Sequence, residues 1–427
     1  MKALKAPARL YGSILFPVAE PDRMQIVADL RASGITVLQR PSSSRFPWSM
    51  SLDHPAWGTA EIVFPKDFPL PAHSLLEQSI GLTPSELQHV LTRRSLVVLT
   101  MPAENETTLG ATKRWLRWGR AAAGTTGLCV IDHRSEHIWS IPALEAELAH
   151  DAPLDVSALY SVRAVYDNEG MLRWMHTHGL EELGGFDLDI FEPNTEMLGT
   201  IGHDVLRSFA FQVLDGRCTP NSRRIDLITG APAQLVPWQT FIRQAPEELI
   251  SLWSRVEHGG RRAVLVERQG VSHRYSRRRF RPYHGTIETL SNALVEFPPT
   301  ATDVMAERAR ATWPWLQHTL ERYASAPEHI SKEIDAQCFV KIGMRTDARF
   351  GFNTEHIWFR ASRLSSDGVE AILESKPRGL KRLERGHTYQ FERTEITGWL
   401  VRTRLGAILP HDDRVARMLA EYGATTL

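Results

Sequence analysis

The sequence lacks an excess of charge of either sign. Lys and Arg together number 50 and Asp and Glu also number 50, so the formal net charge is +0 and the pI is about 7.3. A neutral chain has no overall field that would hold nucleic acid or an anionic membrane, so such binding would have to be local. The sequence also lacks a run of about 18–20 apolar residues, the length of a membrane-spanning helix. These absences predict a soluble protein without a membrane partner.

Cysteine is scarce as well. Cys129, Cys218 and Cys338 are widely spaced, odd in number and set beside apolar residues. They offer no disulfide framework and no paired-cysteine metal knuckle. The apolar stretch 14–18 is too short for the core of a signal peptide, and a proline interrupts it. We therefore expect a cytoplasmic protein.

Motifs of the common enzyme classes are missing. The sequence contains no Gly-x-Ser-x-Gly, no Gly-x-x-x-x-Gly-Lys-Ser/Thr loop and no Gly-x-Gly-x-x-Gly after a strand. Cys129 and Cys338 lie in apolar β runs, where burial raises a thiol pKa and leaves the group unreactive. The sequence thus favours a protein that is not an enzyme, with no catalytic residue and no cofactor.

What is present indicates a folded chain of several domains. The 427 residues suit roughly three domains, and 42% hydrophobic with 23% charged residues is ordinary for a globular protein. Residues 10–100 follow the order β-α-β-β-α-β, which suits a ferredoxin-like sandwich. We predict the α+β class, with a ferredoxin-like unit and its β-α-β-β extension at 1–151, a mixed α/β unit at 152–300, a helical connector at 301–330 and a small β-rich domain with a closing helix at 331–427.

Hydrophobic periodicity and capping patterns predict the individual elements. One expected helix places Met24, Ile26, Val27 and Leu30 on its apolar face and ends at Gly34. Pro314 should kink or split another. The expected helices are 21–33, 84–94, 107–123, 196–214, 246–256, 302–323 and 412–422. The expected strands are 10–18, 35–39, 60–64, 96–100, 128–132, 137–140, 158–166, 171–177, 188–191, 225–228, 263–268, 339–344, 356–362, 369–374, 388–391 and 399–402.

The end of the chain contains the string Glu355-His356-Ile357-Trp358, then Pro377, Leu380, Gly386 and Trp399. Residues 332–405 thereby resemble the bacterial domain of unknown function 2314. Three polar positions of that family pattern differ, because Lys376, His387 and Gly398 stand where the family has Asn, Asp and Asp. Any family site built on those three groups would be altered here.

Further upstream, the segments 174–180 and 185–188 look like the uncharacterised family named domain of unknown function 4026. Neither resemblance implies a known reaction. Together they imply a bacterial, cytoplasmic setting and a domain boundary near 325–335.

His176 and His178 form the strongest candidate for a metal site. On a strand both imidazoles would point to one face, as two zinc ligands require, with Asp187, Asp189 or His203 as a third. Such a site would suit a metal-dependent hydrolase. The structural alternative is that the histidines bond to the backbone. For Asp187 and Asp189 themselves we expect solvent-facing carboxylates, and we expect His133 and His137 to be solvated.

Residues 261–281 form the most basic segment. Its arginines alternate with aromatic residues, which could hold phosphates and stack bases. Alternatively, the arginines protect an edge strand or meet acidic partners. The candidate binding residues here are Arg274, Tyr275, Arg277, Arg278, Arg279 and Arg281. Trp358 and Trp399 are further candidates, although both are also expected to close the core of the last domain.

Three functions follow from these patterns. The first is a non-catalytic protein that binds another protein through an aromatic and Arg-rich surface, for instance an immunity protein that neutralises a bacterial toxin. The second is a metal-dependent hydrolase centred on His176 and His178. The third is nucleic-acid binding through the Arg-rich segment. The absence of catalytic motifs favours the first.

Overall fold

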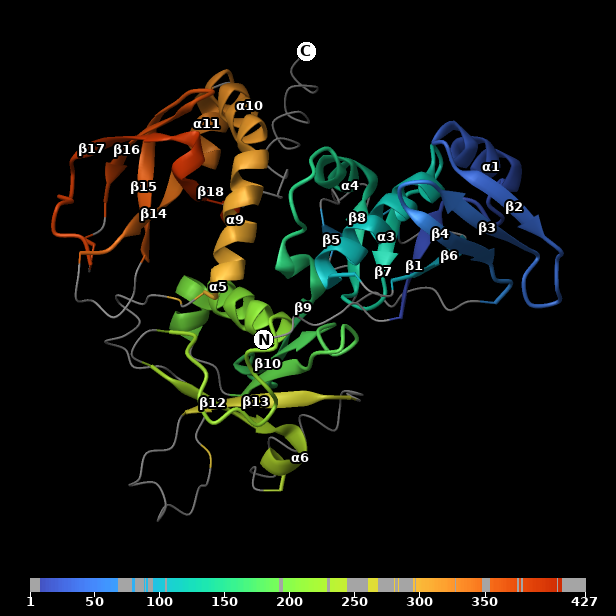
Figure 1. Ribbon diagram of the computed structural model, residues 1–427, viewed down its shortest axis with the longest axis horizontal. Coiled ribbons are helices and arrows are strands. Elements are labelled where there is room, and N and C mark those ends of the chain that lie inside the picture. Colours follow the sequence, from blue (N-terminus) through green and yellow to red (C-terminus); the bar gives the residue numbers. More distant parts are fainter. Residues whose placement is uncertain are drawn as a thin grey trace. The chain divides into compact units, whose positions relative to one another are not determined.

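The computed structural model shows the predicted α+β class, with three mainly antiparallel sheets flanked by helices (Figure 1). The structure describes residues 8–67, 79–80, 88, 90, 95–103, 106–191, 195–228, 231–243, 260–267, 280, 283, 295, 297–326, 328–347, 354–374, 376–377, 379–404 and 406–408. Within them, no helix is both long and apolar enough to cross a membrane.

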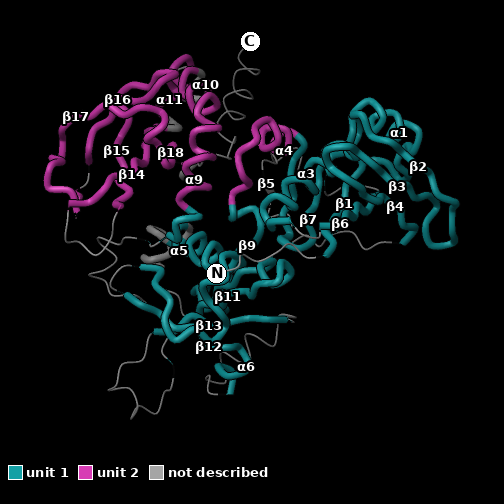
Figure 2. The backbone as a smooth tube through the Cα atoms, in the orientation of Figure 1, with its two compact units in different colours: residues 1–141, 156–301 teal, residues 142–155, 302–427 magenta. Residues whose placement is uncertain are grey.

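The backbone forms two compact units (Figure 2). Residues 1–141 and 156–301 make unit 1, and residues 142–155 and 302–427 make unit 2. The short segment 142–155 therefore leaves the chain of unit 1 and packs with residues that follow it by some 150 positions. The division into four segments at 1–151, 152–300, 301–330 and 331–427 stays a prediction.

The first sheet of unit 1 has the strand order β2-β3-β4-β6-β1-β7-β8-β5. All its neighbouring strands are antiparallel except β5 and β8. The strands are β1 Arg9–Phe16, β2 Thr36–Arg40, β3 Trp48–His54, β4 Gly58–Phe64, β5 Ser79–Ile80, β6 Ser95–Pro102, β7 Cys129–Asp132 and β8 His137–Ser140.

This strand order differs from the predicted ferredoxin-like sandwich. In that fold two β-α-β units are split by each other's strands, so the fourth predicted strand would lie at the edge beside the first. Here β6 lies between β4 and β1, and β1 pairs on its other side with β7. An unpredicted strand, β3, also forms a hairpin with β4. The ferredoxin-like detail is therefore wrong, while the α+β class is confirmed.

Two helices of unit 1 begin after a residue whose side chain accepts hydrogen bonds from the first backbone amides of the helix. Asp22 accepts hydrogen bonds from Met24 and Gln25 at the start of α1, Arg23–Ala32, and Thr107 caps α3, Thr108–Ala123. Gly34, with φ +77, follows α1 as predicted. Met24, expected on the apolar face, is instead 65% exposed.

The helix α3 packs on one face of the first sheet. Trp115 and Trp118, three residues apart on this helix, are both fully buried. The ring of Trp115 lies so close to Gly12 that an added Cβ would be 2.4 Å from it, and the Ile131 carbonyl would be 2.2 Å away. Only glycine leaves room for this helix to sit on β1.

The second sheet of unit 1 has the order β12-β13-β11-β10-β9. The strands expected at 158–166 and 171–177 form an antiparallel hairpin, and in its turn the Asp167 carboxylate accepts hydrogen bonds from the backbone amides of Glu169 and Met171. The strands are β9 Ser161–Tyr166, β10 Leu172–His178, β11 Asp187–Phe191, β12 Ala233–Pro237 and β13 Arg262–Glu267. The helices nearby are η2 Val156–Leu159, α5 Thr195–Leu214 and α6 Trp238–Phe241.

Unit 2 contains an antiparallel sheet in the order β17-β16-β15-β14-β18-β19 and several helices. The helix expected at 302–323 is split at Thr312, as predicted for a break near Pro314, and this proline lies in the first turn of the second helix. Trp313 and Trp399 lie in the core. The strands are β14 Gln337–Arg345, β15 Thr354–Leu364, β16 Gly368–Leu373, β17 Thr388–Glu392, β18 Ile396–Thr403 and β19 Gly406–Ile408. The helices are α4 Ile141–Leu148, α9 Pro299–Ala311, α10 Trp313–Ala324, α11 Glu328–Ile334 and η4 Arg393–Glu395.

Some predicted elements cannot be compared with the structure. The helices expected at 246–256 and 412–422, and most of the one expected at 84–94, lie outside the described residues. Ile225 and Ile228 form isolated bridges instead of the expected strand.

Candidate functional site

The HxH pair lies on β10, which stands between β11 and the edge strand β9 of the second sheet. His176 is 2% exposed and its ring lies 4.4 Å from that of Trp174. His178 is more exposed, and its Nε2 is 3.6 Å from Oε1 of Glu136. In the described part of the chain, no three His, Cys, Asp or Glu side chains gather in a way that could hold a metal ion. The side chain of His203 lies outside that part.

Asp189 is buried, so the expectation of a solvent-facing carboxylate was wrong. It is 0% exposed and stands opposite His176 on the neighbouring strand. Both its oxygens accept hydrogen bonds from Arg262, at 3.0 Å each, and Oδ1 also accepts one from Trp174 Nε1 at 3.0 Å. A forked guanidinium–carboxylate pair of this kind is the geometry that compensates a buried charge.

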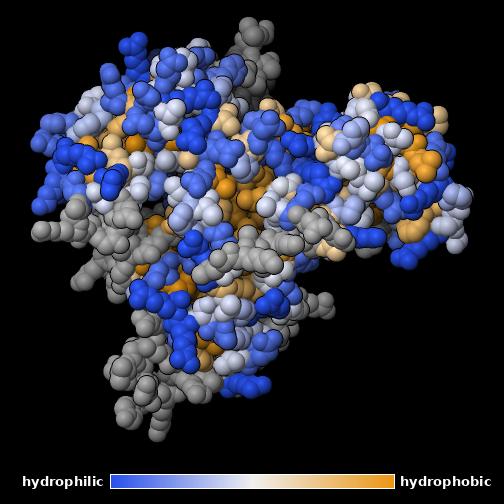
Figure 3. Space-filling model, in the orientation of Figure 1, coloured by the Kyte–Doolittle hydropathy of each residue, from blue (hydrophilic) through white to orange (hydrophobic). Residues whose placement is uncertain are grey.

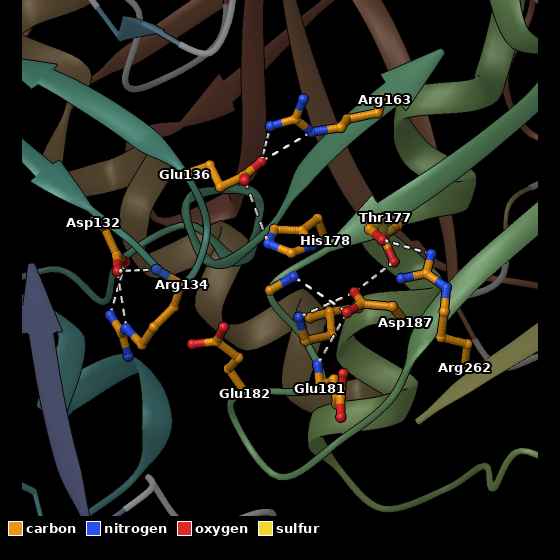
Figure 4. A network of polar contacts seen from close by, with 12 residues as sticks. Asp132, Arg134, Glu136, Arg163, Thr177, His178, Glu181, Glu182, Asp187 and Arg262 are labelled. Carbon is orange, nitrogen blue, oxygen red and sulfur yellow. Dashed lines mark hydrogen bonds and ion pairs between the residues drawn. The ribbon is translucent and has the colours of Figure 1, made fainter. Parts of the chain in front are cut away.

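Asp187 is also buried, at 2% exposure, and organises the turn after β10 (Figure 4). Its carboxylate accepts the Thr177 hydroxyl at 2.9 Å and the backbone amides of Gly179, Leu180 and Glu181 at 3.2 to 3.4 Å. Gly179 has φ +120, and an added Cβ would meet two carbonyl oxygens within 3 Å. The Asp187 carboxylate therefore holds the backbone of this turn in place.

Ionisable side chains gather where the β7–β8 turn meets the second sheet (Figure 4). We call this group the β7–β8 turn cluster; it comprises Asp132, His133, Arg134, Glu136, Arg163 and His178. Arg134 pairs with Asp132 at 2.7 Å, with both side chains 2% exposed. Glu136 accepts hydrogen bonds from Arg163 and lies near His178. These contacts fasten the first sheet to the second within unit 1.

His133 of this cluster contacts Ser13 of β1, and the sequence gave no means of finding this contact. The Ser13 hydroxyl lies 2.7 Å from His133 Nε2, although 120 positions separate the two residues. A serine bonded to a histidine is the first half of a nucleophilic pair. Ser13, however, is 0% exposed in the middle of β1, so its oxygen is out of reach of a substrate. Burial lowers the pKa of His133, which keeps the ring neutral near pH 7.

At the rim of this region, Tyr11 donates a hydrogen bond to Glu182 at 3.3 Å. Burial raises the pKa of Glu182, and burial together with the Glu182 charge raises the pKa of Tyr11. His137, expected to be solvated, is 8% exposed and its Nδ1 lies 3.2 Å from the Ala158 carbonyl oxygen. Most ionisable groups here are therefore occupied in holding segments together.

The cysteines are buried, as the sequence predicts for Cys129 and Cys338. Burial raises the pKa of both Cys218 and Cys338 to about 12. Thiols of this kind are poor nucleophiles at neutral pH.

The Arg-rich segment lies largely outside the described residues, including Arg274, Tyr275, Arg277, Arg278, Arg279 and Arg281. At its start, Arg262 illustrates the predicted alternative of pairing with an internal acidic residue. Trp399 is 1% exposed, stacks on Trp315 and donates to the Thr312 hydroxyl, so it belongs to the core and presents no binding surface. Trp358 is partly exposed, with the Lys341 ammonium 5.2 Å from its ring centre.

Residues Glu355–Trp358 lie on β15, where the first two form hydrogen bonds with neighbouring segments. Glu355 accepts the Gly379 amide at 2.7 Å, and His356 Nδ1 lies 3.0 Å from the Thr397 hydroxyl. Burial, together with the nearby Lys341 charge, lowers the pKa of His356 to about 4. This histidine is therefore neutral in the folded protein at pH 7.

We expect acid to destabilise unit 2 through His356. An unfolded histidine has a pKa of about 6.5, so the unfolded state takes up this proton first as the pH falls. The contribution of neutral His356 to stability is complete above pH 6.5 and is lost between about pH 6.5 and 4. The free energy of unfolding can be measured by hydrogen exchange of the β14 and β15 amides. Between pH 7 and pH 4.5 it should fall less in His356→Gln than in the wild type, because glutamine does not titrate. An equal difference at both pH values would contradict this.

One family model matches the chain. Residues 162–263 match the family described as protein of unknown function (DUF4026) C-terminal, which confirms the resemblance noted for this region. The match spans β9 to the start of β13 and so contains His176, His178, Asp187, Asp189 and Arg262. No curated protein and no solved structure matches the chain. The likeness of residues 332–405 to domain of unknown function 2314 stays a prediction.

Proposed function

We propose that this protein has a non-catalytic function and binds another protein through the open face of its first sheet. The open face consists of two rows of side chains that cross five adjacent strands. The observation that carries the proposal is the exposure of these rows. They are Leu38–Ser51–Glu61–Thr100–Tyr11 and Arg40–Ser49–Val63–Val98–Ser13.

The two sides of the sheet differ in burial. The row on the opposite side contains Met50, Ile62 and Leu99, each 0% exposed, and ends at Gly12 beneath Trp115. On the open face every residue of the two rows except Ser13 is partly or fully exposed, with Leu38 at 67% and Tyr11 at 42%. A half-covered antiparallel sheet alternates in this way.

The composition of the open face favours a protein partner over nucleic acid. Its charged residues are Arg40 and Glu61, which pair with each other at 2.7 Å. A surface that binds phosphates requires unpaired basic groups. The exposed Tyr11 and Arg40 at the ends of the rows are of residue types that are enriched where proteins meet.

A photo-crosslinking amino acid at Thr100 tests the proposal in cells of the source organism, with the exposed Glu169 as the control position. We expect one discrete protein to be crosslinked from Thr100 alone. With that protein purified, Thr100→Arg should weaken binding at least tenfold and Glu169→Arg should leave it unchanged. A nuclease-sensitive product, equal crosslinking from both positions, or unchanged affinity of Thr100→Arg would overturn the proposal.

A toxin-neutralising immunity role is a narrower form of this proposal. It is supported by the absence of catalytic motifs, and by the ion pairs and hydrogen bonds within the protein that engage the ionisable groups described above. A gene for a secreted toxin beside this one would identify the protein to test. Co-expression that leaves that toxin fully active would eliminate the role.

A further inference from the structure

The two most exposed large hydrophobic side chains of the described residues lie on neighbouring elements of unit 1. Leu38 on β2 is 67% exposed and Met24 on α1 is 65% exposed. The two elements contact each other, and Arg23 of α1 donates a hydrogen bond to Gln39 of β2. Figure 3 shows hydrophobic (orange) atoms at the surface in the right-hand part of the view, where Figure 1 places α1 and β2.

The strand β2 is the end strand of the sheet as far as the described residues extend. It pairs with β3 alone, in an unbroken register from Thr36 to Arg40. Four of its five residues are exposed and Val37 is partly exposed, so no described segment covers the strand. It contains no proline or bulge, the devices that commonly protect an edge. Its outer backbone groups are therefore available to another strand.

We propose that β2 pairs with β2 of a second copy of this chain, antiparallel and centred on Leu38. In this register Leu38 stands opposite Leu38 of the second copy, and Thr36 opposite Arg40 of the second copy. Directly opposed residues of an antiparallel pair share a face. The two exposed leucines then cover each other, and the first sheet continues through both copies.

Charge complementarity favours a second copy as the occupant. The incoming Arg40 extends the row Thr36–Asp53–Thr59, in which all three residues are exposed. Asp53 lies two strands from that arginine. Within its own chain Arg40 pairs with Glu61 two strands away, so in the dimer its guanidinium stands between that carboxylate and Asp53 of the other copy. By symmetry the same attraction forms twice, and no like charges stand directly opposite each other.

The helix α1, which lies beside β2, also presents exposed apolar and small residues that a second copy could cover. α1 runs beside β2, and its exposed residues include Met24, Ala28 and Ala32. A two-fold axis through the β2 pair brings the two α1 helices together on the same side of the sheet, antiparallel. The exposed apolar and small residues then have a partner surface of the same kind.

Cysteine crosslinking of the full chain tests the register, because the three native cysteines are buried. Leu38→Cys should oxidise to a covalent dimer. Thr36→Cys and Arg40→Cys should each crosslink poorly alone and readily when mixed, since each faces the other across the pair. Met171→Cys, at a position 58% exposed, is the control for random collision.

Sedimentation of the unmodified protein gives the second measurement. We expect a concentration-dependent dimer whose dissociation constant rises at least tenfold in Leu38→Asp and stays unchanged in Met171→Asp. A monomer at every concentration, or a dimer insensitive to Leu38→Asp, would refute the self-pairing. So would crosslinking of Leu38→Cys no faster than Met171→Cys. If β2 amides gain protection from hydrogen exchange only when a different protein is added, that protein occupies the edge and the self-pairing is also refuted.

Discussion

Asp189→Ala should lower the free energy of unfolding of unit 1 by about 3–5 kcal/mol, the cost of removing one partner from a buried ion pair. Arg262, 2% exposed in its side chain, would keep one hydrogen bond, to the Thr177 carbonyl at 3.1 Å, and lose both bonds to the carboxylate. Trp174 Nε1 would lose its acceptor as well. Chemical denaturation followed by tryptophan fluorescence measures the loss.

Two controls separate the buried charge from the loss of a side chain. Asp226→Ala removes an exposed pair with Arg224, 2.8 Å apart, and should cost less than about 1 kcal/mol. The double variant Asp189→Ala with Arg262→Leu removes both charges and should regain much of the stability lost in the single variant. A single variant as stable as Asp226→Ala would show that Asp189 is dispensable.

Glu147→Ala should have an effect of similar size in unit 2. Glu147 and Arg308 are each 2% exposed in their side chains, and both guanidinium Nη atoms donate to the carboxylate. Arg308 also donates to the Pro153 carbonyl at 3.0 Å. These bonds tie segment 142–155 to α9, so their loss should cost about 3–5 kcal/mol and release the segment. Limited proteolysis within 142–155 and chemical denaturation both report this outcome.

The exposed pair of Glu328 and Lys332 on α11 provides the matched control in the same unit. Its side chains are 82% and 75% exposed, and a helix pair of this spacing contributes only about 0.3–0.5 kcal/mol. Glu328→Ala should therefore leave the proteolysis of 142–155 unchanged. If Glu147→Ala is cut no faster than Glu328→Ala, the ion pair does not hold the segment.

Local patterns predicted the elements whose stability depends on nearby residues. Gly34 follows a helix as predicted, and the helix expected at 302–323 is split near Pro314, because glycine and proline act on the backbone within a few positions. The turn at Asp167 was predictable for the same reason. The strand β3 was missed because it follows a Ser- and Pro-rich stretch and is defined by its hairpin with β4.

The burial of the candidate site residues could not be predicted from local patterns. Asp187 and Asp189 alternate with apolar residues, a pattern typical of a half-exposed strand. Both are nevertheless buried, because Arg262 and the turn amides lie against them. The HxH pair was visible in the sequence, whereas the contact between Ser13 and His133 was not.

The sequence by itself determined the α+β class, most described helices and strands, and the absence of familiar catalytic motifs. Those properties follow from composition, periodicity and capping, which act over a few residues. Only the tertiary structure decided the strand order of the first sheet, the pairing of Arg262 with Asp189, and the position of segment 142–155 in unit 2. Each of these joins residues separated by tens to hundreds of positions, and the free energy that selects such partners comes from burial and charge compensation in the assembled fold.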